Sequence, residues 1–250
     1  MLNGDFSRYY NTYSKIHVLN PLCKILALII FVIMVLMCSN ISVICALSLI
    51  LVFIITLSNV SFKKYFKPLW GMKVLFIFII LINFLFHVSI YSSFIMICKI
   101  CLIVLYSSVL LFTTTTNQLA FGFSSLFRPL AIFGFPVSKF SMAIALSINF
   151  IPSLFLQSNK ILKSQMSRGF NYDKGSFKDR VVAIKSIVIP MFVLSIKRAD
   201  KVADAMEVKQ FNFNCDRSNL KAEGWHFSDV YMLACHLMIF VLVLVKEVVL

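Results

Sequence analysis

The chain has 250 residues, of which 60% are hydrophobic and only 14% are charged, and its mean hydropathy is +0.91. Soluble domains average about 45–50% apolar and about 25% charged residues, so this composition excludes an ordinary soluble protein and predicts an integral membrane protein. The net charge of +14 is then explained by basic residues in cytoplasmic loops, since no nucleic-acid-binding motif accompanies it.

The first 116 residues are predicted to form an N-terminal membrane domain (1–116) with about four spans. No charged residue occurs between Ile25 and Phe62, a length that holds two spans of about 20 residues each with a turn at Ser39–Asn40. Basic residues precede the first span and follow the second, which places the N-terminus on the cytoplasmic side of the cell membrane. The four spans are expected near residues 22–38, 41–58, 70–88 and 94–112.

Lys99 lies inside the fourth predicted span. A charged residue within a membrane is a candidate functional site by default. Lys99 is also near enough to the outer end of the span for its ammonium group to reach the interface. Both interpretations stay open on the sequence.

Residues 117–223 are predicted to form a coupling region. Pro129, Pro136 and Pro152 are expected to divide its first part, up to residue 168, into short helices at the membrane interface. Two longer cytoplasmic helices, here named the coupling helices, and one probable span at 181–196 are expected within the same region. Residues 224–250 are expected to form a C-terminal span.

An amphipathic helix is predicted to follow the 181–196 segment. Ala199, Ala203 and Met206 recur at helical spacing on one of its faces, and charged residues occupy much of the remainder. Small residues in such a stripe allow close helix crossing or contact with a neighbouring membrane subunit.

Two short basic motifs close the predicted coupling helices. A helix C-terminus favours basic residues through its dipole, so both motifs are open to an ordinary positive-inside interpretation. Arginine also binds carboxylates in a bidentate manner, which suits an acidic groove on a partner protein. The motifs are Ser167, Arg168 and Gly169 in the first case, and Val208, Lys209 and Gln210 in the second.

Sequence motifs of catalysis are missing. The chain contains no GxxxxGK[ST] nucleotide-binding loop, no HExxH or GxSxG motif and no Asp-rich metal motif. Cys98 and Cys101 form a CxxC pair without a second pair or histidines at ligand spacing, so we expect two thiols on a membrane helix and no metal site. These observations predict a protein that is not an enzyme.

Four stretches of the sequence resemble a known family. The chain is similar to the transmembrane (T) component of energy-coupling factor transporters, the family that includes the cobalt-transport protein CbiQ. The stretches cover nearly the whole chain: Ser14, His17, Asn20, Pro21 and Lys24 in the pattern S-x-x-H-x-L-[DN]-P-x-x-K; TTTTNQL with Phe127–Pro136; Ile144–Pro152; and QMSRGF with ADAMEVKQF at two Ala-Arg-Gly signatures.

The resemblance implies a non-catalytic coupling subunit of an importer for vitamins or transition metals. Members of the family hold two cytoplasmic ABC ATPases and a small substrate-binding membrane (S) subunit, and ATP and Mg²⁺ are bound by the ATPases. The resemblance therefore implies that this chain binds no cofactor, metal or nucleic acid and contacts the lipid bilayer. It also implies that Arg168 and Lys209 dock in grooves of the two ATPases.

The second signature departs from the family pattern. Lys209 stands where arginine is usual, which keeps the charge but loses the bidentate fork, and Gln210 stands where glycine is usual. Loss of the glycine predicts loss of the flexible helix cap at this end. Ser167 replaces alanine in the first signature, and Asn149 stands where arginine is usual.

The predicted fold class is an all-α integral membrane protein with about five to six transmembrane helices and amphipathic cytoplasmic coupling helices. Two other functions were weighed against the coupling subunit. A self-contained channel or secondary transporter would use intramembrane charges at the midplane, for which Lys99 is the main candidate. A membrane-embedded enzyme is disfavoured by the missing motifs.

Overall fold

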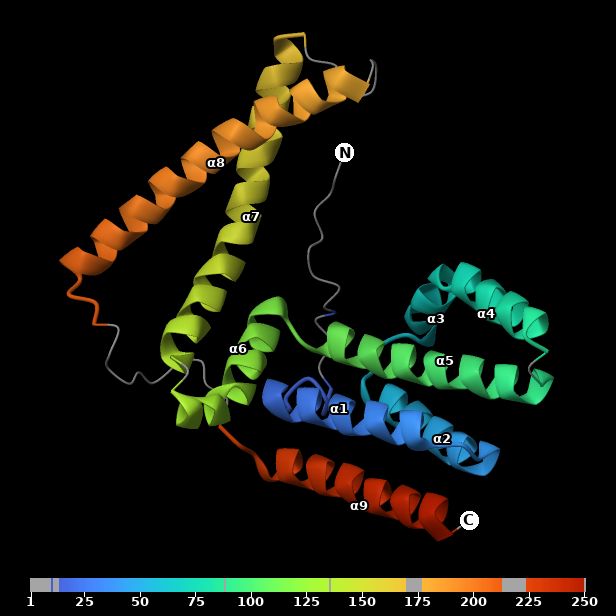
Figure 1. Ribbon diagram of the computed structural model, residues 1–250. Coiled ribbons are helices and arrows are strands. Elements are labelled where there is room, and N and C mark those ends of the chain that lie inside the picture. Colours follow the sequence, from blue (N-terminus) through green and yellow to red (C-terminus); the bar gives the residue numbers. More distant parts are fainter. Residues whose placement is uncertain are drawn as a thin grey trace. The chain divides into compact units, whose positions relative to one another are not determined.

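The computed structural model describes residues 10, 14–87, 89–134, 136–169, 177–212 and 224–249. Every regular element in these ranges is helical, which confirms the all-α prediction (Figure 1). The elements are α1 (Pro21–Met37), α2 (Ile41–Leu57), α3 (Phe62–Gly71), α4 (Lys73–Leu85), α5 (Ile90–Thr113), α6 (Thr116–Leu126), the 3₁₀ helix η1 (Arg128–Phe133), α7 (Val137–Ser167), α8 (Phe177–Val208) and α9 (Phe227–Val249).

The chain divides into two compact units. The first unit comprises Met1–Pro129 together with Leu220–Leu250, and the second comprises Leu130–Asn219. The first unit extends to Pro129 because α6 packs on α1. The C-terminal helix α9 also packs on α1 and so completes the first unit.

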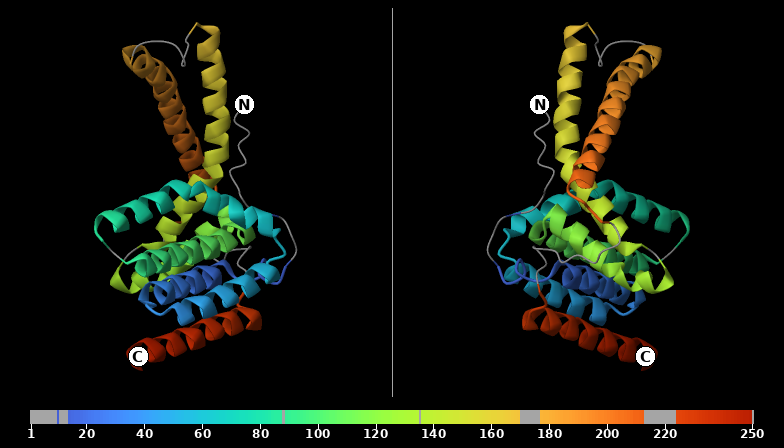
Figure 2. Two further views of the ribbon diagram at one scale, coloured as in Figure 1. Left: turned by 90° about the vertical axis from the view of Figure 1, so that its right-hand side faces the viewer. Right: turned by 90° about the vertical axis from the view of Figure 1, so that its left-hand side faces the viewer.

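Within the first unit the helices form layers around α1 and α5. Figure 2 shows α9 beside α1 and α2, then α5, and then α3 with α4. The Phe31 ring of α1 stacks on the Tyr106 ring of α5 with a centroid distance of 4.4 Å. The Tyr106 hydroxyl donates to Nε2 of His236 in α9 over 2.8 Å, so three helices share one buried aromatic centre.

The first predicted hairpin is confirmed to within one residue at each helix end. α1 and α2 begin after Asn20 and Asn40, and the Asn20 side chain accepts a hydrogen bond from the Leu22 amide. Asparagine is a preferred N-cap residue because its side chain satisfies an amide that the helix leaves without a partner. Ser39–Asn40 is the turn between the two helices, as predicted.

The predicted third span, 70–88, contains helix α4. A separate helix that was not predicted, α3, precedes it from Phe62, includes the three lysines that follow the second span, and meets α4 at a bend of 51°. The lysines are tolerated because α3 is amphipathic, with apolar residues on a separate stripe. The bend lies at Met72, whose φ of −93° and ψ of 6° interrupt the helix directly after Gly71.

Pro152 does not end a helix, contrary to the prediction. α7 runs through it without a break over 31 residues. A proline removes one backbone hydrogen bond, but a long apolar helix tolerates the loss when side chains and neighbouring turns support it. The predicted 181–196 segment and the amphipathic helix predicted to follow it form one helix, α8, which runs through Pro190. Among the described helices, α8 is not one of those long and apolar enough to cross a membrane.

The described residues contain three helices that are long and apolar enough to cross a membrane. These are α5, residues Lys139–Ser167 of α7, and α9, and the bent pair α3–α4 raises the number to four if it counts as one span. α1 and α2 are apolar but have 17 residues each, about 25 Å of helix. The predicted total of five to six transmembrane helices is therefore reached only if the shorter helices α1 and α2 are counted as spans.

Candidate functional site

The C-terminus of α7 presents the first basic motif. Ser167 is the last helical residue and Arg168 is the C-cap, and both are exposed. Gly169 follows in the left-handed region with φ of +88°. The amide of Arg168 donates to Gln165 O and the amide of Gly169 donates to Met166 O, each over 3.0 Å.

The C-terminus of α8 is also followed by a left-handed residue. Val208 is the last helical residue, and Gln210 adopts a left-handed φ of +51°. Its amide donates to Glu207 O over 2.8 Å, and the amide of Phe211 donates to Met206 O over 2.9 Å. This pair of bonds is a Schellman motif, the common end of an α-helix. The predicted loss of the cap at Gln210 is therefore wrong.

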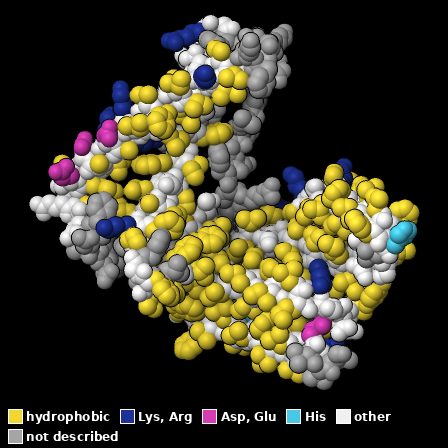
Figure 3. Space-filling view, in the orientation of Figure 1, with side chains coloured by type: hydrophobic (Ala, Val, Ile, Leu, Met, Phe, Trp, Pro, Cys, Tyr) yellow, Lys and Arg dark blue, Asp and Glu magenta, His cyan; other side chains and the backbone are white. Residues whose placement is uncertain are grey.

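Both helix ends thus place an exposed basic residue directly before a left-handed residue. Arg168 and Lys209 occupy the same position of the cap, where the positive charge also interacts favourably with the helix dipole. Their surroundings differ. Lys160 and Lys163 precede Arg168, whereas three acidic residues of α8 precede Lys209, and Figure 3 shows the acidic side chains of the second unit gathered on this part of α8.

Replacing Gln210 with glycine is expected to stabilise this cap. A non-glycine residue in the left-handed region costs about 1 kcal/mol, and glycine adopts the conformation without strain. We expect the amides of Gln210 and Phe211 to exchange with deuterium about fivefold more slowly in Gln210→Gly, measured by hydrogen exchange. Gln210→Val, which is disfavoured at positive φ, should accelerate the exchange; equal rates in all three proteins would contradict the assignment.

The small-residue stripe is mainly exposed in the described structure. Ala199 and Ala203 are exposed and Met206 is half-buried, so their predicted contacts with another helix or subunit stay a prediction. Within the second unit, α7 and α8 contact each other through residues outside this stripe. Arg198 of α8 donates to the Ser153 hydroxyl of α7. Ala183 of α8 is 2% exposed and is the buried apolar residue of this helix.

Lys99 supports the turn between α1 and α2. Its ammonium group donates to Leu36 O, near the end of α1, over 3.3 Å. On the other side of the turn, the Glu247 carboxylate of α9 accepts hydrogen bonds from the amides of Ser39 and Asn40 over 2.9 and 3.3 Å. The positive Lys99 thus lies at the C-terminal end of α1, and the negative Glu247 lies at the N-terminal end of α2. Both charges interact favourably with the helix dipoles, which gives Lys99 a structural role.

The N-terminal motif forms a connected polar cluster. The Ser14 hydroxyl donates to Nδ1 of His17 over 2.6 Å, and Nε2 of His17 donates to Tyr10 O over 3.0 Å. Burial lowers the pKa of His17 below its usual value and the Lys24 ammonium lowers it further, although the bond to Tyr10 opposes the shift. The buried Lys24 donates to His17 O and to Thr113 O over 3.2 and 3.1 Å.

Asp229 joins this cluster to α9 and was missed by the sequence reasoning. It is fully buried, and its carboxylate accepts from the amides of Asn20 and His226, each over 2.8 Å. Cys23 donates its thiol hydrogen to Asp229 O over 3.3 Å. The sequence signal that could have identified it is an acidic residue at the start of an apolar C-terminal helix. If such a carboxylate is buried, it needs hydrogen-bond donors from other segments of the chain.

The described residues bring no three His, Cys, Asp or Glu side chains close enough to hold a metal ion. Cys98 and Cys101 are both half-buried on α5. Both thiols therefore lie on one helix, as predicted.

Comparison with known proteins gives one family and several relatives. The model of the cobalt transport protein family, CbiQ, matches residues 12–219. The energy-coupling factor transporter transmembrane protein EcfT of Bacillus subtilis is 27% identical over 242 residues, which cover 89% of this chain and 90% of that protein. The EcfT of Streptococcus thermophilus is 29% identical over 259 residues, covering 94% of this chain and 97% of the relative.

Proposed function

The chain belongs to the cobalt transport protein (CbiQ) family and is a transmembrane component of an energy-coupling factor transporter. From this premise we propose that it is the non-catalytic coupling subunit of an ATP-driven importer. Two ABC ATPases bind to its coupling helices on the cytoplasmic side. A small membrane subunit that binds the substrate, a vitamin or a transition metal, contacts its membrane helices. ATP and Mg²⁺ are held by the ATPases.

The matched ends of α7 and α8 carry this proposal. Each offers an exposed basic side chain at a rigid helix cap, Arg168 in one case and Lys209 in the other. A left-handed residue after the cap turns the chain away from the helix axis, so the basic side chain stays accessible at the tip. Such a side chain can enter a groove lined by carboxylates, and arginine does so with two parallel hydrogen bonds.

The two ends are expected to contribute unequally. Arg168 has the bidentate fork, which favours a groove lined by carboxylates. Lys209 binds as a point charge and follows acidic residues of α8, which repel the same groove. The proposal therefore assigns the stronger docking contact to α7.

The proposal predicts the outcome of a co-purification experiment. The full chain, tagged, is co-expressed with candidate ATPase subunits and compared with Arg168→Ala and Lys209→Ala. Loss of a central arginine contact typically weakens binding by 2 kcal/mol or more, so we expect about 30-fold weaker ATPase binding in Arg168→Ala. Lys209→Ala should weaken it by about fivefold.

Two control variants separate docking from general charge effects. Lys163→Ala removes an exposed charge four residues before the last helical residue of α7, and it should bind ATPases as the parent does. Lys209→Arg restores the fork and should strengthen binding. Failure to recover any ATPase with the parent chain would overturn the coupling function, and equal losses in Lys163→Ala and Arg168→Ala would overturn the assigned contact.

A further inference from the structure

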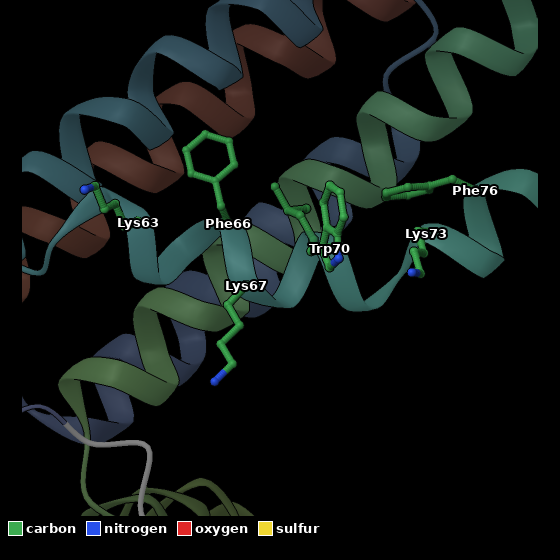
Figure 4. Close-up of a pocket in the computed structure, with 7 residues that line it drawn as sticks. Lys63, Phe66, Lys67, Trp70, Lys73 and Phe76 are labelled. Atoms are coloured by element: carbon green, nitrogen blue, oxygen red, sulfur yellow. The ribbon is translucent and has the colours of Figure 1, made fainter.

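The bent pair α3–α4 carries basic and aromatic side chains that lie outside the two basic motifs of α7 and α8. They line an open hollow of about 510 Å³ on the first unit. Figure 4 shows the Trp70 ring between Lys67 and Lys73, with Phe66 directed to the other side of α3 from Lys67. The hollow is lined by three lysines, Lys63, Lys67 and Lys73, and by the rings of Phe66, Trp70 and Phe76.

The sequence of α3 separates charge from apolar surface. Phe62, Phe66 and Trp70 recur every four residues and form one stripe, and Lys63 and Lys67 form the adjacent stripe. The exposed fractions of Phe66 and Trp70 are 67% and 76%. A tryptophan beside lysines is typical of the headgroup layer of a membrane, where the ring is amphipathic and the ammonium groups reach phosphates.

The helix that continues the hollow is apolar and uncovered. None of the residues of α4 is buried in the described structure, and Figure 3 shows hydrophobic side chains over this part of the first unit with basic side chains at its edge. An apolar surface beside three lysines that line the same hollow matches the two parts of a phospholipid, its acyl chains and its phosphate.

The charge of these lysines has no counterpart within the described first unit. The sequence contains no Asp or Glu between Asp5 and Asp173. Among the described residues of the first unit the acidic side chains are Asp229 and Glu247, and both carboxylates accept backbone amides of other segments. No carboxylate in the described part of the first unit therefore pairs with the α3–α4 lysines, so their charge is available to an anionic ligand.

From the hollow, the exposed apolar surface and the excess of positive charge, we infer that the α3–α4 hollow binds an anionic phospholipid. The headgroup phosphate lies among the ammonium groups of Lys63, Lys67 and Lys73, and the acyl chains cover the Trp70 and Phe76 rings. Lys73 already lies with its Nζ 5.7 Å from the centre of the Trp70 ring, so headgroup and ring bind at the same end of the hollow. This site is independent of ATPase docking.

Quenching of Trp70 fluorescence tests the inference. The full chain, with Trp225→Phe so that Trp70 is the remaining tryptophan, is placed in phosphatidylcholine vesicles that contain a fraction of brominated phosphatidylglycerol or brominated phosphatidylcholine. Because each lysine near an anionic surface contributes about fivefold to binding, we expect at least about fivefold preference for the brominated phosphatidylglycerol at low salt. The preference should fall as salt is added.

Matched variants keep the test specific. The triple change Lys63→Gln, Lys67→Gln and Lys73→Gln should reduce the preference to within about twofold of unity, and the corresponding three arginine substitutions should preserve it. Glutamine at three exposed lysines of α8 removes the same charge elsewhere and should leave the preference unchanged; these are Lys185, Lys197 and Lys201.

Four outcomes would overturn the inference. Equal quenching by both brominated lipids shows that the hollow does not select anionic lipid. An equal loss of preference in the α8 control shows a general surface charge effect. Abolition of the preference by an excess of soluble glycerol phosphate shows a site for soluble phosphate. Absence of quenching by either lipid shows that the Trp70 ring does not contact acyl chains.

Discussion

Replacing Asp229 with alanine is expected to lower the free energy of unfolding by about 3 kcal/mol. The carboxylate is fully buried and accepts the amides of Asn20 and His226 over 2.8 Å each. Alanine removes the acceptor of the buried Asn20 amide and of the part-buried His226 amide. Loss of the acceptor of a buried donor costs about 1–3 kcal/mol, and the second loss adds a smaller amount. In a chain of this length the change corresponds to a fall in Tm of about 6–12 °C, measured by thermal unfolding in detergent.

The conservative variant Asp229→Asn separates the effect of lost hydrogen bonds from the effect of lost side-chain volume. Asparagine retains one side-chain oxygen, which can serve the amide of Asn20 or that of His226, so about half of the loss should be recovered. Ser228→Ala, one residue earlier and exposed, is the matched control and should change Tm little. An unchanged Tm in Asp229→Ala would contradict the role of this carboxylate in joining α9 to the start of α1.

Gly122→Leu is expected to have a comparable effect through packing. Gly122 lies on α6 against α1, where a Cβ would be 2.7 Å from Ile25 Cδ1 and 3.2 Å from the backbone carbon of Pro21. The end of Ile25 can move, but the Pro21 backbone cannot do so without displacing the start of α1. A leucine should therefore cost about 3 kcal/mol, visible as a fall in Tm of about 6–12 °C.

Two glycine-to-alanine substitutions serve as controls for Gly122→Leu. Gly122→Ala gains about 1 kcal/mol of helix propensity and loses about as much to the close contacts, so its Tm should change little. Gly71→Ala meets nothing within 4 Å and should raise Tm slightly. If Gly122→Leu unfolds at the parent temperature, the close approach of α6 to α1 is not required for stability.

Local patterns predicted the hairpin of the first unit well. A long apolar run interrupted by Ser39–Asn40 leaves one place for the turn, and α1 and α2 end where this pattern places them. The start of α3 was missed because the lysines were interpreted as a loop between spans. Their four-residue spacing beside Phe62, Phe66 and Trp70 indicates an amphipathic helix instead.

Contacts between distant segments could not be predicted in this way. Lys99 was open to two interpretations, and neither included its hydrogen bond to Leu36 O, because that acceptor is 63 residues away in the sequence. Asp229 contacts Asn20 across 209 residues, and no local pattern reports such a pair. For the docking motifs, the sequence located both helix ends, but the left-handed cap at Gln210 depends on backbone geometry that the residue type does not favour.

The contact between Asn20 and Asp229 also constrains the order of events during synthesis. A ribosome adds about 5–20 residues per second, so roughly 10–40 s separate the appearance of Asn20 from that of Asp229. During this interval α1 can enter the membrane, yet the amide of Asn20 lacks its final acceptor. The first unit can reach its native state only after its last helix has been made, and nascent chains that lack α9 should therefore be the targets of membrane quality control.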